Sequence, residues 1–166
     1  MIKDIPNFKN TKIDWGRSQS DIIKLLEKRG IVETRFTNIS YETAIKAGMK
    51  MMENTSAIML EFMKPITQQD GTNGILPIKM IIPNIPIDEK LRRQAYRIFW
   101  HYLKNKFIGI DSGLIEFEQE FMPHIAIGKG DATGTMWNVF EKKMLPKIIS
   151  GESSNINLLE PPKNNN

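Results

Sequence analysis

The sequence predicts an α+β domain in which an antiparallel sheet of three or more strands packs on a long amphipathic helix, followed by a helical C-terminal part. Three patterns predict this class. Segments in the first half alternate apolar and polar side chains, residues 88–110 repeat apolar side chains at helical spacing, and residues 134–149 return to a helical pattern. A chain of 166 residues can bury one sizeable core, so we expect a single domain.

The first helix is predicted over residues 18–29. Ser18 or Ser20 can cap its start, and Asp21 in the first turn suits the helix dipole. Gly30 ends it. The apolar side chains that form one face are Ile22, Ile23, Leu25 and Leu26.

Three segments read as strands because they alternate or are rich in apolar side chains. They are residues 31–39, 57–63 and 75–82. In the first strand Phe36 alternates with Arg35, which predicts one buried and one exposed face. Pro77 lies near the start of the third strand and favours an edge position. Residues 65–74 read as a turn or exposed loop, and residues 41–53 are ambiguous because Gly48 interrupts a helical spacing.

The second half is predicted to be helical. The expected helices cover residues 88–110, 115–124 and 134–149, with a loop over 128–133. We expect residues 13–150 to form the single α+β domain. Residues 1–12 are polar and read as a flexible lead-in, and residues 151–166 read as a mostly disordered tail.

Composition limits the functional classes. The chain has no cysteine, which excludes disulfides, thiolate nucleophiles and cysteine-ligated zinc. No signal peptide and no apolar run of about 20 residues is found, so a cytoplasmic protein without a membrane span is expected. The formal net charge is +4, from 23 basic and 19 acidic residues. This surplus favours an anionic partner only where it is concentrated.

The long helix concentrates basic side chains on one narrow stripe. At about 100° per residue, Arg93, Arg97, Trp100 and Lys104 fall within about 60° of one another. The opposite, core-facing side is expected to contain Leu91, Ala95, Ile98, Phe99, Tyr102 and Leu103.

Two explanations of this stripe stay open. Trp100 can pack under a neighbouring element while the arginines pair with carboxylates, for example those of residues 116–120. Alternatively, bases stack on the indole while the cations hold phosphates. Four further residues extend the second model as candidate nucleic-acid contacts: Trp15, Arg17, Arg35 and Phe36. The second model requires the cations of the stripe to be accessible to outside anions.

Catalytic and metal-binding motifs are not found in the sequence. His101 and His124 are the two histidines and no motif joins them. Residues 128–135 (GKGDATGT) lack the spacing of a phosphate-binding P-loop. Glu116 and Glu120 share a helix face and are a weak Mg²⁺ candidate. We therefore predict a non-catalytic protein without metal or cofactor.

Three blocks of the chain resemble an uncharacterised family of small proteins encoded by bacterial phages, prophages and plasmids. They are residues 17–30, residues 93–125 with the run RQAYR, SG and FEQEF, and a weaker pattern of glycine, tryptophan and leucine positions from Gly134 to Leu159. Arg93, Arg97 and Lys104 fall on recurring basic positions of this family, whereas Trp100 and the insert at 40–56 depart from it. The resemblance implies a mobile-element setting.

The function predicted from these observations is non-catalytic nucleic-acid binding for a mobile element, with single-stranded DNA in replication or recombination preferred. The alternative is a protein–protein interaction module, either a homo-oligomeric phage protein or an inhibitor of a host defence system. In that alternative the methionine-rich residues 49–63 supply an adaptable interface.

Overall fold

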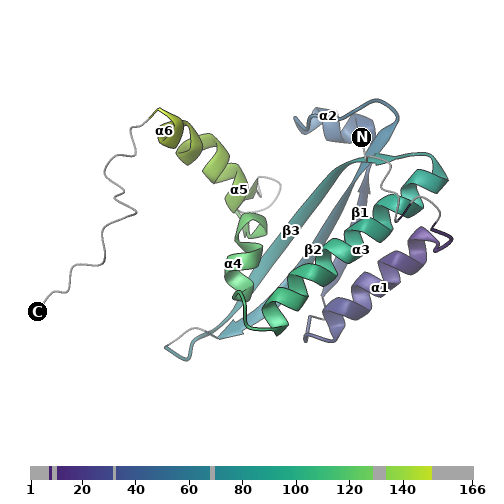
Figure 1. The fold of residues 1–166 in the computed structure, drawn as a ribbon. Helices are drawn as coiled ribbons and strands as arrows, with labels where there is room; N and C mark the ends of the chain where they lie inside the picture. The colour runs from purple at the N-terminus through teal and green to yellow at the C-terminus, as the bar shows by residue number, and fades with distance from the viewer. Residues whose placement is uncertain (1–7, 9–10, 32, 68–69, 129–133, 151–166) are drawn as a thin grey trace, which may run out of the picture.

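The computed structural model describes residues 8, 11–31, 33–67, 70–128 and 134–150. The predicted fold class is confirmed: a three-stranded antiparallel sheet packs on a long helix, α3, and a helical part follows at the C-terminal end (Figure 1). Most of the expected lead-in over 1–12, most of the loop over 128–133 and the tail over 151–166 lie outside the described residues. No helix in the described part of the chain is long and apolar enough to cross a membrane.

The first helix, α1 (Trp15–Glu27), begins three residues earlier than expected because Asp14 caps it. The Asp14 carboxylate accepts a hydrogen bond from the Gly16 backbone N–H at 2.8 Å. After the helix, Gly30 takes a positive φ of 73°, which a glycine adopts without strain. Gly30 thus turns the chain out of the helix toward the sheet.

The sheet contains β1 (Thr34–Ile39), β2 (Thr55–Thr67) and β3 (Asn73–Pro86) in the order β1-β2-β3. The outer position of β3 agrees with the edge position predicted from Pro77. The turn predicted over 65–74 is present around Asp70 and Gly71 but is shorter than expected, because β2 and β3 stay paired as far as Thr67 and Asn73. Pro65 is tolerated there because β1 begins at Thr34, opposite Phe62, and does not reach Pro65, so no strand on that side needs the missing N–H.

The ambiguous residues 41–53 begin with a short helix, α2 (Tyr41–Lys46). Its cap is Ser40, whose hydroxyl accepts a hydrogen bond from the Thr43 N–H. The segment then returns to the sheet, where the Met52 N–H donates to the Asn84 side chain at 2.7 Å. This bond ties the insert to β3.

The long helix α3 (Glu89–Asp111) lies beside α1 on the same face of the sheet (Figure 1). Ala95, Phe99 and Leu103 are buried as predicted, but Tyr102 is 46% exposed. Tyr96 and Phe107 are almost completely buried instead. The buried side of α3 is therefore rotated from the predicted one, because α3 packs on α1 as well as on the sheet.

The C-terminal part consists of short pieces. They are α4 (Phe117–Phe121), the 3₁₀ turn η2 (Met122–His124), β4 (Ala126–Ile127), β5 (Gly134–Thr135), α5 (Met136–Val139), the π-helical turn η4 (Phe140–Met144) and α6 (Leu145–Ile149). Phe121 anchors them, because its ring packs against those of Phe62 and Phe107 at 5.8 and 5.5 Å. The helical pattern expected over 134–149 is thus present in three consecutive pieces.

Candidate nucleic-acid interface

The positive charge of the chain is concentrated in the helix layer, defined here as residues 14–30 and 88–111. These segments contain ten basic and six acidic residues, and this surplus of four equals the formal net charge of +4 of the whole chain. The rest of the chain is therefore neutral on balance. The charge surplus therefore favours attraction of a polyanion to the layer of α1 and α3.

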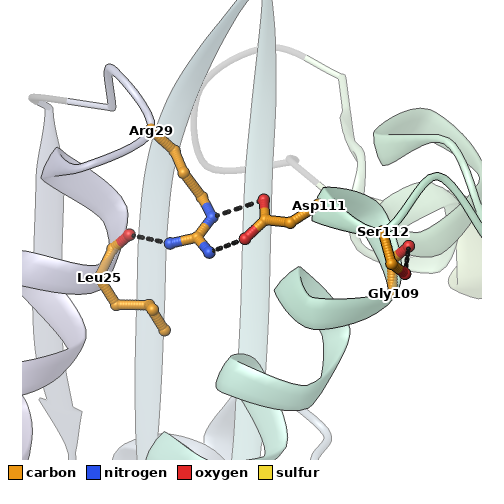
Figure 2. Close-up of polar contacts among 5 residues, drawn as sticks. All are labelled: Leu25, Arg29, Gly109, Asp111 and Ser112. Atoms are coloured by element: carbon orange, nitrogen blue, oxygen red, sulfur yellow. Dashed lines mark hydrogen bonds and ion pairs between the residues drawn. The ribbon is translucent and has the colours of Figure 1, made fainter.

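The two helices of this layer are joined by contacts along their whole length, which we call the seam. At one end the guanidinium of Arg92 lies 4.7 Å from the ring centre of Trp15, whose indole packs 5.7 Å from the Tyr96 ring. At the other end Arg29, in the turn after α1, pairs with Asp111 of α3 and donates a 2.8 Å hydrogen bond to the Leu25 carbonyl (Figure 2). The seam thus holds α1 and α3 in register.

Arg97 lies in the middle of the seam and is bound internally. Its guanidinium donates to the Asp21 carboxylate at 3.1 Å and stacks 3.9 Å from the centre of the Trp100 ring. The Arg97 side chain is only 16% exposed. The structure therefore agrees with the first explanation of the stripe for this arginine, although the carboxylate is Asp21 and not one of residues 116–120.

Trp100 is half-buried and does not present an open platform. The indole packs against the main hydrophobic core, Arg97 stacks over its ring and the Lys104 ammonium lies 5.1 Å from its centre. His101 meets its edge at a ring distance of 4.5 Å. Base stacking on Trp100 would require Arg97 to leave both the ring and Asp21.

A hollow of about 490 Å³ remains beside Trp100, between the two helices. Its lining residues are Asp21, Lys24, Leu25, Glu27, Lys28, Trp100 and Lys104. The three lysines are exposed, and none of them forms an ion pair within the described part of the chain. Asp21 is already paired with Arg97, so three ammonium groups face one remaining carboxylate, Glu27. This local surplus suits an anion with more than one negative charge.

The positive charges near this hollow also affect the pKa of His101. Burial lowers the pKa of its imidazole below the ordinary value of 6.5, and the positive charges of Arg97 and Lys104 lower it further. The neighbouring Phe8 ring packs 5.1 Å from it. His101 is therefore a neutral neighbour of the cations near pH 7 and not an additional cation.

The remaining predicted contact residues are spread over different places. Arg93 is half-buried on α3, and Arg17 is exposed on α1. Phe36 packs against the core below the helices, whereas Arg35 lies on the opposite, open face of the sheet and pairs with Glu61. Trp15, Phe36 and Trp100 are thus packing residues, and Arg35 does not belong to the same surface as Lys104.

Sequence reasoning missed Lys24 and Lys28 as partners of Lys104. The signal was present, because the two lysines follow at i and i+4 on a helix that was correctly expected. What was missing was the packing of α1 beside α3, which depends on the tertiary structure.

No metal centre is found among the residues that the structure describes, since none of their acidic and histidine side chains gather in a group of three or more. Glu120 pairs with Lys106, and Glu116 serves as the cap of α4. Glu120 of the Mg²⁺ candidate is therefore bound by a lysine, whereas Glu116 is exposed at the start of α4.

Comparison with known proteins adds no relative: no family model, no curated protein and no solved structure matches the chain.

Proposed function

We propose that the protein is a non-catalytic nucleic-acid-binding protein that holds the phosphate backbone on its helix layer, in the cytoplasm of the cell that carries the mobile element. The supporting observation is the hollow beside Trp100, where Lys24, Lys28 and Lys104 converge within the layer that contains the charge surplus of the chain. The resemblance of residues 93–125 to proteins of phages and plasmids fits a role in replication or recombination.

In this proposal affinity comes from phosphate contacts and counterion release. Because Arg97 covers the ring of Trp100, stacking of bases contributes little. We still expect a single strand to bind more tightly than a duplex, because its flexible backbone can follow the hollow between the two helices and a stiff duplex cannot. Lys24 on α1, Lys28 at the C-cap of α1 and Lys104 on α3 would contact neighbouring phosphates.

The test is fluorescence anisotropy with a labelled single strand and the matching duplex at two salt concentrations. The variant Lys24→Gln/Lys104→Gln removes one lysine from each helix, whereas Lys46→Gln/Lys50→Gln removes two exposed lysines of the insert and serves as the matched control. We expect the first variant to lower the slope of log affinity against log salt by about 1.4 for a single strand, and the control to leave it nearly unchanged. Salt-independent binding, or an equal loss in both variants, would argue against this site.

The alternative of a protein–protein interaction module has its own support. Met52 and Met63 of the methionine-rich residues are 44% and 40% exposed. The stronger observation lies at the C-terminal end, where residues 136–149 expose several large apolar side chains. They are Met136, Trp137, Val139, Met144, Ile148 and Ile149. A segment that exposes this many large apolar side chains is typical of a binding interface.

A further inference from the structure

The C-terminal column, defined as α4, η2, α5, η4 and α6, has charges of opposite sign at its two ends. Residues 112–128, at the end with α4, contain three glutamates and no lysine or arginine. Residues 134–150, at the end with α6, contain three lysines and one glutamate. Figure 1 shows α4 and α6 at opposite ends of this column, beside the β3 side of the sheet.

Most of these charges are exposed. Glu116 and Glu118 are exposed at the acidic end, while Glu120 is bound to Lys106 of α3. At the basic end Lys142, Lys143 and Lys147 are all exposed. The acidic end thus offers two carboxylates to a partner, and the basic end offers three ammonium groups.

Both ends also expose apolar side chains next to the charges. Leu114 is 84% exposed and Met122 is 53% exposed at the acidic end. Ile148 and Ile149 are 45% and 77% exposed at the basic end. Each end therefore combines a charge of one sign with apolar area that water solvates poorly.

The two ends cannot satisfy each other within one chain, because they lie at opposite ends of the column (Figure 1). Two copies arranged antiparallel bring each basic end beside the acidic end of the other copy. Such an arrangement has two-fold symmetry and uses the same surface on both copies. Parallel pairing would instead place lysines against lysines, which is unfavourable.

We propose that the protein forms a symmetric dimer in which the C-terminal columns of two copies pack antiparallel, with α6 of one copy against α4 of the other. The proposal rests on the protein–protein interaction function above and is independent of nucleic-acid binding. Ile148 and Ile149 would cover Leu114 and Met122 of the second copy, while the lysines pair with Glu116 and Glu118.

The test is light scattering after size exclusion, with the full chain at several concentrations. We expect a dimer that dissociates on dilution, and Ile148→Asp is expected to raise the dimer Kd at least about tenfold because it places a carboxylate in the apolar contact. The matched control Ile87→Asp changes a side chain that is 63% exposed but lies outside the column, and should leave the dimer unchanged.

Charge exchange distinguishes the antiparallel pairing from any other dimer. The variant Lys142→Glu/Lys143→Glu/Lys147→Glu makes both ends acidic, and Glu116→Lys/Glu118→Lys makes both ends basic. We expect each variant alone to be monomeric and their equimolar mixture to form a heterodimer, because both contacts are then complementary. Since Glu116 caps α4, thermal unfolding checks the second variant, and Glu118→Lys alone repeats the test with a smaller change.

A wild-type chain that is monomeric at every concentration would overturn the proposal. A dimer that survives Ile148→Asp, or a mixture of charge variants that stays monomeric, would do so as well. The helix layer and the column share no residue. We therefore expect Ile148→Asp to weaken the dimer and to leave oligonucleotide binding unchanged.

Discussion

The seam between α1 and α3 packs its charged and aromatic side chains against one another, whereas the basic end of the C-terminal column, residues 134–150, leaves charged and apolar side chains exposed. In the seam Arg97 has Asp21 and Trp100 as partners, so little of its charge remains for a ligand. In the column Lys147 and Ile148 lie next to each other and both face solvent. The comparison shows that an amphipathic pattern alone does not identify a binding surface; what matters is whether a neighbouring element has already occupied it.

The largest expected difference concerns apolar side chains. Leu103 of α3 is completely buried, whereas Ile149 of α6 is 77% exposed. We expect Leu103→Ala to lower the free energy of unfolding by about 2–5 kcal/mol and Ile149→Ala to change it by less than about 0.5 kcal/mol. Urea unfolding measures both, at protein concentrations low enough to keep the chain monomeric. A comparable loss in Ile149→Ala would mean that the column packs within its own chain.

The ion pair of the seam is expected to have the next largest effect. Arg97→Ala leaves the Asp21 carboxylate without its partner at the helix contact and should cost about 1–3 kcal/mol of unfolding free energy. A double-mutant cycle with Asp21→Ala isolates the coupling between the two side chains. If the two single losses simply add, Arg97 stabilises the seam through Trp100 and not through Asp21.

The ion pair on the open face of the sheet is the matched comparison. Arg35 pairs with Glu61, but the Arg35 side chain is 71% exposed compared with 16% for Arg97. Because water screens an exposed pair, Arg35→Ala should cost only about 0–1 kcal/mol. The same urea experiment tests it, and a loss as large as that of Arg97→Ala would show that exposure does not explain the difference.

The smallest expected effect is a pH dependence that involves His124, at the base of the column. Burial lowers the pKa of His124 below its ordinary value of 6.5; the charge of Lys106 lowers it further, and that of Glu120 opposes this. As the pH falls through 6.5, the unfolded chain takes up a proton that the folded chain does not, so the free energy of unfolding decreases. The decrease ends once the pH is below the pKa of the folded state.

Comparing His124→Gln with the wild type isolates this contribution. Between about pH 7.5 and about pH 5.5 the melting temperature of the variant should fall less than that of the wild type. Equal falls in the two proteins would show that His124 is solvated more than the structure indicates. His101→Gln is the control for the second histidine, whose pKa is lowered in the same direction.

The sequence by itself determined the class and the order of the elements. Alternation around Phe36, the apolar run from Ala57 and the helical repeat over 88–110 each depend on local period, which the chain expresses without any tertiary contact. The predicted loop over 65–74 was too long because proline and glycine signals were taken to end the strands. The pairing of β2 with β3 nevertheless continues past Pro65. The proline lacks an N–H, but β1 does not extend to this position, so no strand on the β1 side of β2 requires a hydrogen bond from it.

The tertiary structure decided the candidate site. The long helix has a basic stripe in the sequence, but only the packing of α1 along α3 determines that Arg97 is bound to Asp21 while Lys24, Lys28 and Lys104 remain around the hollow. The opposite charges at the two ends of the column are readable from the sequence, whereas their separation in space is not. Local spacing specifies which side chains share a face of one helix; which face stays accessible depends on the neighbour that packs against it.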